Sequence, residues 1–414
     1  LRYLRKAQFE ALETYWYLRL VEKTPHIFDL YKKIYDDPVS LLESLGINLP
    51  KEELIRLLNS GNLDSIFAKI KSDDIFVKKY RLEAVRESLT LDYPSYILAL
   101  AMGSGKTVLI GSIISTEFAM ALEYENSFVK NALVFAPGKT ILGALKEISD
   151  IPFEKILPQR YYKQFISSVK ITYTRDKEKD IPIVKGSSFN IIVTNTEKIR
   201  IQKSTTNGTQ LTLFNYKEKE RIEEIANLRL QTIASLPHLS IFSDEAHHTY
   251  GQSLDKELKK VRKTVDYLAQ NTNVIVVVNT TGTPYYKKQM LRDVVYWYGL
   301  SQGIKDWLLK EVSDGIISYG DVSVKNFISE VLEDFFKDYK DIKIYDGAKS
   351  KIAIYFPQTN DVKKIKPFVE QKVMELGLDS SVVFDVDNKS DEKKKDLFNN
   401  RINDPHLQYR VFLL

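Results

Sequence analysis

Apolar and polar positions divide the chain into two parts. Up to about residue 90, apolar side chains recur every three or four residues, which is the spacing of amphipathic helices. One such series is formed by Leu4, Ala7, Ala11, Leu12 and Tyr15. Beyond this point, short β-branched runs alternate with stretches of helical length. We therefore predict a helical region over 1–90 and an α/β region after it.

Continuous apolar runs in the second part predict buried strands. These runs are YILALA (96–101), ALVFAP (132–137), NIIVTN (190–195), LSIFSDEA (239–246) and VIVVVNTTG (274–282). Such strands, separated by segments long enough for helices, are typical of a parallel sheet that is buried on both faces. Ligands of open α/β sheets bind at the carboxyl ends of the strands. We predict an α/β fold with a parallel-sheet lobe over 91–300.

The rest of the chain predicts a helical segment and then a second sheet. Residues 285–340 have a helical pattern, and the core candidates in it are Trp297, Trp307, Phe335 and Phe336. A new strand-helix series is formed by KIAIYFPQ (351–358), VVFDVD (382–387) and YRVFLL (409–414). We expect a helical connector over 301–345 and the beginning of a second lobe over 346–414. Because Leu1 is not a methionine and the last strand reads as cut short, we expect a longer parent protein.

Composition excludes several classes of protein. A chain of 414 residues with 43% hydrophobic and 28% charged residues is typical of a globular protein with two or three domains. The absence of cysteine excludes disulfides, cysteine–zinc sites and thiol nucleophiles. No apolar run reaches the roughly 18 residues that span a bilayer, and no signal peptide opens the chain. We therefore expect a cytoplasmic protein without a membrane partner. The formal charge of +5 permits a basic surface without requiring one.

A phosphate-binding loop is predicted at AMGSGKT (101–107), between a strand and an apolar helical run. Its two glycines let backbone N–H groups turn toward phosphate oxygens. The lysine supplies a positive charge for the β- and γ-phosphates, and the threonine hydroxyl is placed for Mg²⁺. We predict ATP and Mg²⁺ as ligands. The expected nucleotide-binding residues are Gly103, Ser104, Gly105, Lys106 and Thr107.

Two adjacent carboxylates close a later predicted strand. Asp244 can hold Mg²⁺, and Glu245 can polarise the water that attacks the γ-phosphate. Burying charge directly after an apolar strand is costly without a cation, which favours a catalytic pair over a surface pair. We therefore predict Lys106, Asp244 and Glu245 as catalytic residues.

Together these motifs resemble those of superfamily 2 helicases of the DEAD/DEAH-box type. Leu100 stands where the strict phosphate-loop pattern has a glycine, as it does in many of these helicases. The Asp-Glu-Ala-His sequence, together with TTGTP (280–284), is most similar to the Res subunits of type III restriction enzymes. The resemblance implies two RecA-like lobes. It also implies that His247 relays the state of the nucleotide to Thr281 and Thr283.

The resemblance also places nucleic-acid contacts after two strands, in FAPGKT (135–140) and TNTEKI (194–199). The implied contact residues are Pro137, Gly138, Lys139 and Thr194.

The glutamine that reads adenine has two candidate positions. Gln8 fits the family pattern but requires a long insertion before the phosphate loop. A second frame, KKYRLEAV (78–85), has a more usual distance but puts Arg81 in the glutamine position. We prefer Gln8, because an amide donates and accepts hydrogen bonds, as the adenine edge requires, whereas arginine only donates.

By this resemblance, the function is an ATP-driven motor that translocates on double-stranded DNA. A modification or specificity subunit is a candidate partner. The family's arginine finger and any nuclease would lie beyond residue 414, since Arg401 and Arg410 come too early. Two alternatives stay open, an RNA helicase and an ATP-dependent scaffold that does not move on nucleic acid. The Thr-Gly-Thr-Pro form favours DNA over RNA.

Weaker patterns are assigned to packing or solvent. RYYKQF (160–165) and YYKKQ (285–289) interleave aromatic and basic residues, as surfaces that stack bases do. With 24 tyrosines and 60 basic residues, such clusters are expected by chance. Glu370 and Lys372 have the spacing of a nuclease motif, but no suitable aspartate-bearing strand precedes them.

Overall fold

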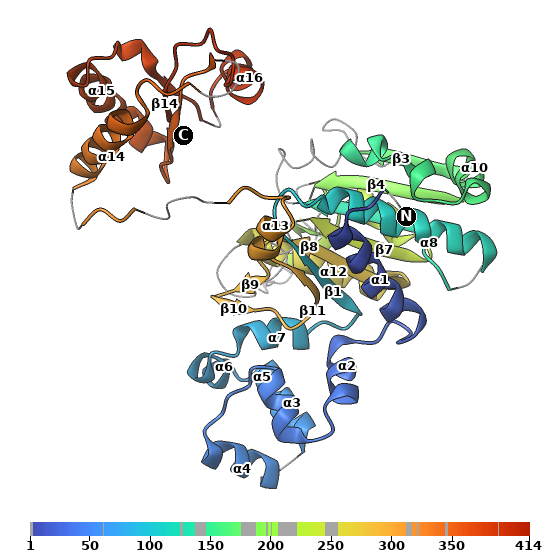
Figure 1. Ribbon diagram of the computed structural model, residues 1–414. Helices are drawn as coiled ribbons and strands as arrows, with labels where there is room; N and C mark the ends of the chain where they lie inside the picture. Colours follow the sequence, from blue (N-terminus) through green and yellow to red (C-terminus); the bar gives the residue numbers. More distant parts are fainter. Residues whose placement is uncertain are drawn as a thin grey trace, which may run out of the picture. The chain divides into compact units, whose positions relative to one another are not determined.

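The computed structural model divides the chain into two compact units, Leu1–Glu311 and Val312–Leu414. Figure 1 gives the element labels used below. The residues that the structure describes are 3–60, 62–124, 127–136, 146–174, 188–195, 198–199, 201–205, 222–244, 256–311, 317–320, 323–343, 347–387 and 389–414.

The first unit opens with helices and continues as an α/β lobe. The opening helices are α1 (Lys6–Leu20), α2 (Ile27–Ile34), α3 (Pro38–Ser44), α4 (Lys51–Ser60), α5 (Leu63–Ser72), α6 (Asp74–Tyr80) and α7 (Glu83–Leu89). The later helices are α8 (Lys106–Glu123), η1 (Lys146–Asp150), η2 (Phe153–Lys155), α10 (Gln159–Ser168), α11 (Leu228–Ala234), α12 (Lys256–Asn271) and α13 (Leu300–Lys305). The strands are β1 (Ser95–Leu100), β2 (Asn131–Ala136), β3 (Val169–Tyr173), β4 (Phe189–Asn195), β5 (Ile201–Thr205), β6 (Ile222–Ala226), β7 (Leu239–Asp244), β8 (Val274–Thr281), β9 (Tyr285–Tyr286), β10 (Gln289–Met290) and β11 (Val294–Tyr298).

The described strands include a seven-stranded sheet with the order β11-β1-β8-β7-β2-β4-β3. All of its neighbouring strands run parallel. The five inner strands are the five apolar runs of the sequence, so the predicted α/β fold with a RecA-like lobe is confirmed. The order also brings the carboxyl ends of β1, β8 and β7 side by side at one edge of the sheet.

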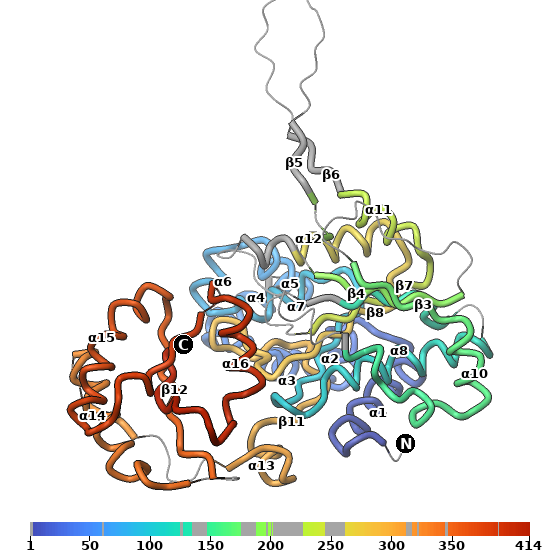
Figure 2. Tube along the Cα trace, turned by 90° about the horizontal axis from the view of Figure 1, so that it is seen from above, coloured from blue at the N-terminus to red at the C-terminus, as the bar shows by residue number. Residues whose placement is uncertain are grey.

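Alternate residues of the inner strands build two separate cores. In β1, Leu98 and Leu100 pack on one face while Ile97 and Ala99 pack on the other. The first face is covered by α1, α8 and α10, and the second by α11 and α12, as Figure 2 shows. Burial on both faces explains why these strands are apolar throughout rather than alternating.

Helices α2–α7 form an insertion between α1 and the first inner strand. They have a core of their own, centred on the fully buried Leu45, Ile66 and Ile70. The first helix, α1, packs instead on α8 through Ala11 and Tyr15. The helical region expected over 1–90 is therefore helical, but its first helix belongs to the α/β lobe.

The prediction of helix over 285–340 is wrong at its beginning. This stretch contains the β9–β10 hairpin and β11, which is an edge strand of the sheet. Two of its core candidates are also wrong, because Trp297 is 46% exposed and Trp307 is 94% exposed. Trp307 lies two residues after the end of α13 and has a positive φ of 58°, and its side chain is exposed while Leu308 and Leu309 pack against the core. Phe336 is buried, as predicted.

The second unit is a smaller α/β unit. Its elements are α14 (Val324–Tyr339), β12 (Ile352–Ile354), α15 (Thr359–Glu375), η5 (Ser380–Val382), β13 (Val383–Asp385), α16 (Glu392–Arg401) and β14 (Val411–Leu413). Its three described strands are parallel in the order β12-β14-β13, with α14 and α15 on one face and α16 on the other. The predicted strands of the second series are thus present. Helix α14, which we expected in a connector, packs on α15 within this unit.

None of the helices in the described ranges combines the length and the apolar character needed to cross a membrane.

Candidate active site

The phosphate loop lies where the sequence predicts it, between buried β1 and α8. Gly103 and Gly105 have positive φ angles of 75° and 85°, which side chains other than glycine rarely adopt. Ser104 is buried and donates its hydroxyl hydrogen bond to the Ala101 carbonyl, at 2.6 Å. The left-handed conformation of Gly105 starts α8 at Lys106, so the positive end of this helix faces the loop.

Gln8 contacts this loop directly, although 97 residues separate it from Gly105. Its Nε2 donates a hydrogen bond to the Gly105 carbonyl at 3.0 Å, and its Oε1 accepts one from the Arg5 backbone N–H at 2.9 Å. A Cβ on Gly105 would lie 2.2 Å from Gln8 Nε2, so the amide fills the space that the glycine leaves. Of the two candidate positions for the adenine-reading residue, the structure brings Gln8 to the loop.

Arg5 is a site residue that the sequence reasoning missed. Its Nη1 donates to the Gly103 carbonyl at 3.3 Å, so one turn of chain supplies two polar contacts to the loop. Its position three residues before Gln8 could have identified Arg5 from the sequence as a neighbour of the loop.

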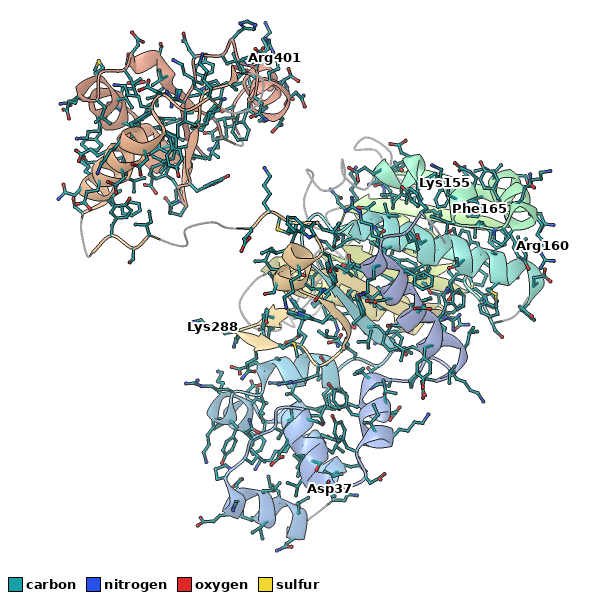
Figure 3. All side chains as sticks on the ribbon, viewed as in Figure 1. Asp37, Lys155, Arg160, Phe165, Lys288 and Arg401 are labelled. Carbon is teal, nitrogen blue, oxygen red and sulfur yellow. The ribbon has the colours of Figure 1, made fainter. Side chains whose placement is uncertain are left out.

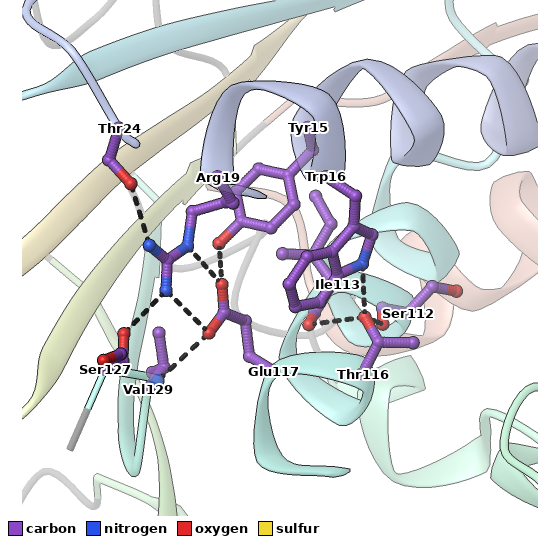
Figure 4. Close-up of polar contacts among 10 residues, drawn as sticks. All are labelled: Tyr15, Trp16, Arg19, Thr24, Ser112, Ile113, Thr116, Glu117, Ser127 and Val129. Atoms are coloured by element: carbon purple, nitrogen blue, oxygen red, sulfur yellow. Dashed lines mark hydrogen bonds and ion pairs between the residues drawn. The ribbon is translucent and has the colours of Figure 1, made fainter. Parts of the chain in front are cut away.

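A buried polar cluster fixes α1 on α8 (Figure 4). Glu117 of α8 is fully buried and pairs with Arg19 of α1, with 2.6 Å between Oε1 and Nε. The same carboxylate accepts hydrogen bonds from the Tyr15 hydroxyl at 2.6 Å and the Val129 backbone N–H at 3.0 Å. We call Tyr15, Arg19 and Glu117 the clasp. It holds the helix that carries Gln8 against the helix that follows the phosphate loop.

Burial and charge act together in the clasp. Burial, and then the neighbouring Glu117 carboxylate, raise the pKa of the Tyr15 hydroxyl well above its usual range, so it stays protonated and donates. Burial by itself lowers the pKa of Arg19, but the hydrogen bond to Glu117 and the electrostatic interactions with Tyr15 and Glu117 together outweigh it, and the net pKa is raised. The remaining donors of Arg19 reach the Thr24 hydroxyl and the Ser127 carbonyl. The buried charges are therefore paired.

Asp244 ends β7, which β8 separates from β1, the strand that leads into the phosphate loop. It is 8% exposed, and its Oδ1 accepts a hydrogen bond from the Thr280 hydroxyl at 2.9 Å. Thr280 lies in β8 opposite Asp244 on one side and Leu98 of β1 on the other. The sequence reasoning chose Thr281 and Thr283 and missed Thr280, although the register of adjacent strands makes it the residue nearest the carboxylate.

The TTGTP segment continues from β8 past the phosphate loop. Thr281 is fully buried, and its hydroxyl accepts a hydrogen bond from the Thr283 backbone N–H at 3.1 Å. A Cβ on Gly282 would lie 3.5 Å from the Leu100 carbonyl, so this segment runs close to the end of β1. The TTGTP segment therefore lies next to the end of β1, which leads into the phosphate loop, and contains Thr280, which binds Asp244.

Other predicted site residues lie elsewhere. Glu245, His247, Pro137, Gly138 and Lys139 lie outside the described residues. Thr194 is fully buried at the end of β4, and its hydroxyl shares a hydrogen bond with that of Thr174 at 2.8 Å. The nucleic-acid contact that the resemblance implies for Thr194 stays a prediction, and it would require this buried hydroxyl to become accessible. The β-strand ending at Asn195 keeps this side chain in the interior.

The gathered residues fit a nucleotide with Mg²⁺. Gly103 and Gly105 hold the loop in the left-handed conformation, and a helix of 18 residues begins at Lys106, directly after it. Asp244 and Thr107 offer the oxygen ligands that Mg²⁺ prefers, and Lys106 lies at the start of the same helix. Carboxylate, hydroxyl and ammonium groups thus meet at one edge of the sheet.

A known family matches this chain. The family model described as "Type III restriction enzyme, res subunit" matches residues 77–286, which are 210 of the 414 residues. The chain belongs to this family. It is a helicase-like ATPase of superfamily 2 related to Res subunits. The match includes the phosphate loop, the carboxylate strand and the TTGTP segment, but it begins after Gln8. A search of the curated proteins finds none that matches.

Two solved structures illustrate more remote similarity to this Res-family chain. UvsW of T4 has 9% sequence identity and a TM-score of 0.26, over 77% of this chain and 53% of that one. A nuclease-deletion mutant of the Type ISP restriction-modification enzyme LlaGI, in complex with a DNA substrate mimic, has 12% identity and a TM-score of 0.29. That match covers 72% of this chain and 23% of LlaGI. The chain thus spans about half of UvsW and a smaller part of LlaGI.

Proposed function

We propose that this chain is the ATP-hydrolysing part of a motor that translocates on double-stranded DNA, as a Res-type subunit. One observation carries the proposal. Gln8, the phosphate loop and the Asp244–Thr280 pair come from three distant parts of the sequence and meet at the carboxyl edge of β1, β8 and β7. Family membership supports DNA rather than RNA as the polymer.

The residues of the site have separate roles in binding ATP and in hydrolysing it. Backbone N–H groups of the loop and the Lys106 ammonium would hold the phosphates. Thr107 and Asp244 would hold Mg²⁺, which when bound neutralises charge on the phosphate oxygens. Glu245 keeps its proposed role of orienting the attacking water, and His247 its role of signalling toward Thr281.

Gln8 would recognise adenine with the amide N–H and the oxygen lone pair that are not used in its contacts with Gly105 and Arg5. The amide has one N–H on the loop and one oxygen lone pair on Arg5. A second N–H and a second lone pair remain for an adenine edge, which offers one acceptor and one donor. This favours ATP over nucleotides with a different edge.

No arginine finger is assigned to the described residues of the second unit. Arg410 is buried and donates to the carbonyls of Ser350, Lys340 and Tyr339, so it closes the end of α14. Arg401 is exposed and pairs with Asp404. We propose that a finger, which can be worth about 10³–10⁵ in rate, comes from elsewhere in the full-length protein.

ATP hydrolysis by the full-length protein, measured with duplex DNA, single-stranded DNA, RNA or no polymer, tests the proposal. We expect the strongest stimulation with duplex DNA. Stimulation by RNA alone would favour the RNA helicase, and no stimulation by any polymer would favour the scaffold. Lys106→Ala should abolish hydrolysis under all four conditions and leave the fold intact. The control, Lys163→Ala at an exposed position of α10, should retain hydrolysis. Hydrolysis that survives in Lys106→Ala would mean that the site lies elsewhere.

A further inference from the structure

Two segments that are distant in sequence meet in a basic surface outside the nucleotide site. The hairpin of β9 and β10 contacts the turn between α6 and α7, where Gln289 Nε2 donates a hydrogen bond to the Arg81 carbonyl. Lys287 Nζ lies 3.1 Å from Glu83 Oε1 at the start of α7. Its cations are Arg81, Lys287 and Lys288, and we call these three residues the hairpin surface.

This surface carries three cations and one carboxylate, Glu83. Among the described residues, Lys287 is the one of the three that has a carboxylate within ion-pair distance, Glu83. Arg81 and Lys288 are exposed, and Lys288 extends from the hairpin tip away from the sheet (Figure 3). The single carboxylate of Glu83 balances one of the three cations, so the surface keeps a net positive charge that attracts a polyanion.

The backbone of this surface is strained. Seven described residues other than glycine have a positive φ, and three of them are Arg81, Lys287 and Lys288. Lys287 and Lys288 form a two-residue hairpin loop with positive φ at both positions, as in a type I′ turn, for which Asn-Gly is preferred. L side chains rarely adopt this left-handed conformation, because Cβ comes too close to the following carbonyl oxygen. Lysines at both positions are therefore not explained by the turn.

Aromatic side chains continue the surface along the hairpin. Tyr285 is 48% exposed and stacks edge to face on Trp297, which is 46% exposed, with 6.1 Å between ring centroids. Met290 pairs with Tyr285 across the hairpin and is also exposed. Lysines beside exposed rings are the combination that binds a sugar–phosphate chain and its bases.

The hairpin is also close to the catalytic groups along the chain. It directly follows the TTGTP segment, and the Tyr285 backbone N–H donates to the Thr283 carbonyl at 2.7 Å. Thr280, at the start of this segment, binds Asp244. A ligand that binds the hairpin therefore binds next to the TTGTP segment, whose Thr280 donates a hydrogen bond to Asp244.

We propose that the hairpin surface binds the phosphodiester backbone of DNA. The proposal rests on the proposed DNA-dependent function and adds a contact site to it. Lys287 and Lys288 supply phosphate contacts from the tip, and Arg81 supplies one from the turn. Tyr285 and Trp297 pack on sugars or bases.

The test exchanges the tip lysines for the residues that the turn prefers. In the full-length protein, Lys287→Asn with Lys288→Gly removes two positive charges and relaxes the hairpin, so thermal unfolding should occur at the same temperature or higher. The matched control is Lys23→Asn with Lys51→Asn. It removes the same charge at two exposed positions of the same unit, and Lys23 also has a positive φ.

DNA affinity is measured by fluorescence anisotropy against salt, with a labelled duplex and the matching single strand. Each phosphate contact contributes about 0.9 to the slope of log affinity against log salt on a duplex. We expect the tip variant to bind more weakly and its slope to fall by about 2, while the control keeps the wild-type slope. ATP hydrolysis without DNA should be unchanged in both variants.

The failures of the two proposals are distinguishable. If the wild type neither binds DNA nor responds to it, the proposed function fails. If the wild type binds DNA and the tip variant has the same affinity and slope, only the hairpin surface is overturned. A tip variant that keeps its DNA slope but loses a protein partner would also overturn it, and would identify a protein-docking surface instead.

Discussion

Arg19 of α1 and Glu117 of α8 form a buried ion pair, with 2.6 Å between Nε and Oε1, across 98 residues of sequence. The insertion α2–α7 lies between these two helices in the chain, so the covalent connection places little restraint on α1. The clasp supplies that restraint. The position of Gln8 at the phosphate loop therefore depends on a charge pair about three turns of helix away along α1.

Breaking the clasp on one side should be costly. Glu117→Ala leaves Arg19 buried without its carboxylate, so we expect unit 1 to lose about 3–5 kcal/mol of unfolding free energy. Urea unfolding followed by tryptophan fluorescence reports on unit 1, because Trp16, Trp297 and Trp307 all lie there. The control is Arg160→Met, which breaks an exposed pair with Glu123 and should cost no more than about 1 kcal/mol. Equal losses in the two variants would contradict a buried role for the clasp.

Gln8→Glu keeps the size of the side chain and its acceptor for the Arg5 N–H. It replaces the donor to the Gly105 carbonyl with a charged oxygen, which is repelled. We expect the KM for ATP to rise about 10- to 100-fold, because the loss of a polar contact leaves a buried group unsatisfied. Discrimination between ATP and GTP should fall with it. The control is Gln164→Glu on exposed α10, and an unchanged ATP preference in Gln8→Glu would remove Gln8 from the adenine site.

The inner sheet was predictable because burial on both faces makes its strands apolar throughout. The edge strand β11 was not, since Val294 and Val295 are only partly buried and Trp297 is exposed, which leaves no continuous pattern. A segment of mixed burial can be read as helix or strand. Its pairing with β1 decides the matter, and pairing is a long-range property.

The loop and the carboxylate strand were predictable because their residues are adjacent in sequence. The contacts that position Gln8 were not, because Arg19 and Glu117 read singly as surface charges and only tertiary packing pairs them. Gln8 and Arg81 could be ranked only by hydrogen-bonding capacity. The fold separates them by placing one at the loop and the other at the hairpin.

Thr280→Val should slow hydrolysis without weakening ATP binding. Valine has nearly the same shape, but it cannot donate to Asp244 Oδ1. A hydrogen bond to a charged group is worth about 1.5–3 kcal/mol, so kcat should fall about 10- to 100-fold and more Mg²⁺ should be needed for half-maximal rate. Thr264→Val, at a buried position on α12, is the matched control and should retain kcat. A kcat that is unchanged in Thr280→Val would mean that this hydroxyl does not orient the carboxylate.

The second unit should have its own dependence on acid. Asp385 at the end of β13 pairs with Lys366 of α15 at 2.6 Å and with Lys394 of α16 at 2.9 Å. Burial acts to raise the pKa of Asp385, but the two lysines outweigh it and the net pKa is lowered. A lowered folded pKa contributes stability above the unfolded value of about 3.9, and this contribution is lost as the pH falls through the folded value.

Amide hydrogen exchange in β13 and β14, corrected for intrinsic rates, measures this dependence in a unit that has no tryptophan. In the wild type, protection of these strands should be constant near neutral pH and should fall below about pH 4. Asp385→Asn should lower protection at neutral pH and flatten the fall in acid, because the amide carries no charge for the lysines to stabilise. Asp338→Asn, at an exposed position on α14, should change neither. If Asp385→Asn and the wild type have the same protection at every pH, then α15 and α16 are held to β13 by apolar packing alone.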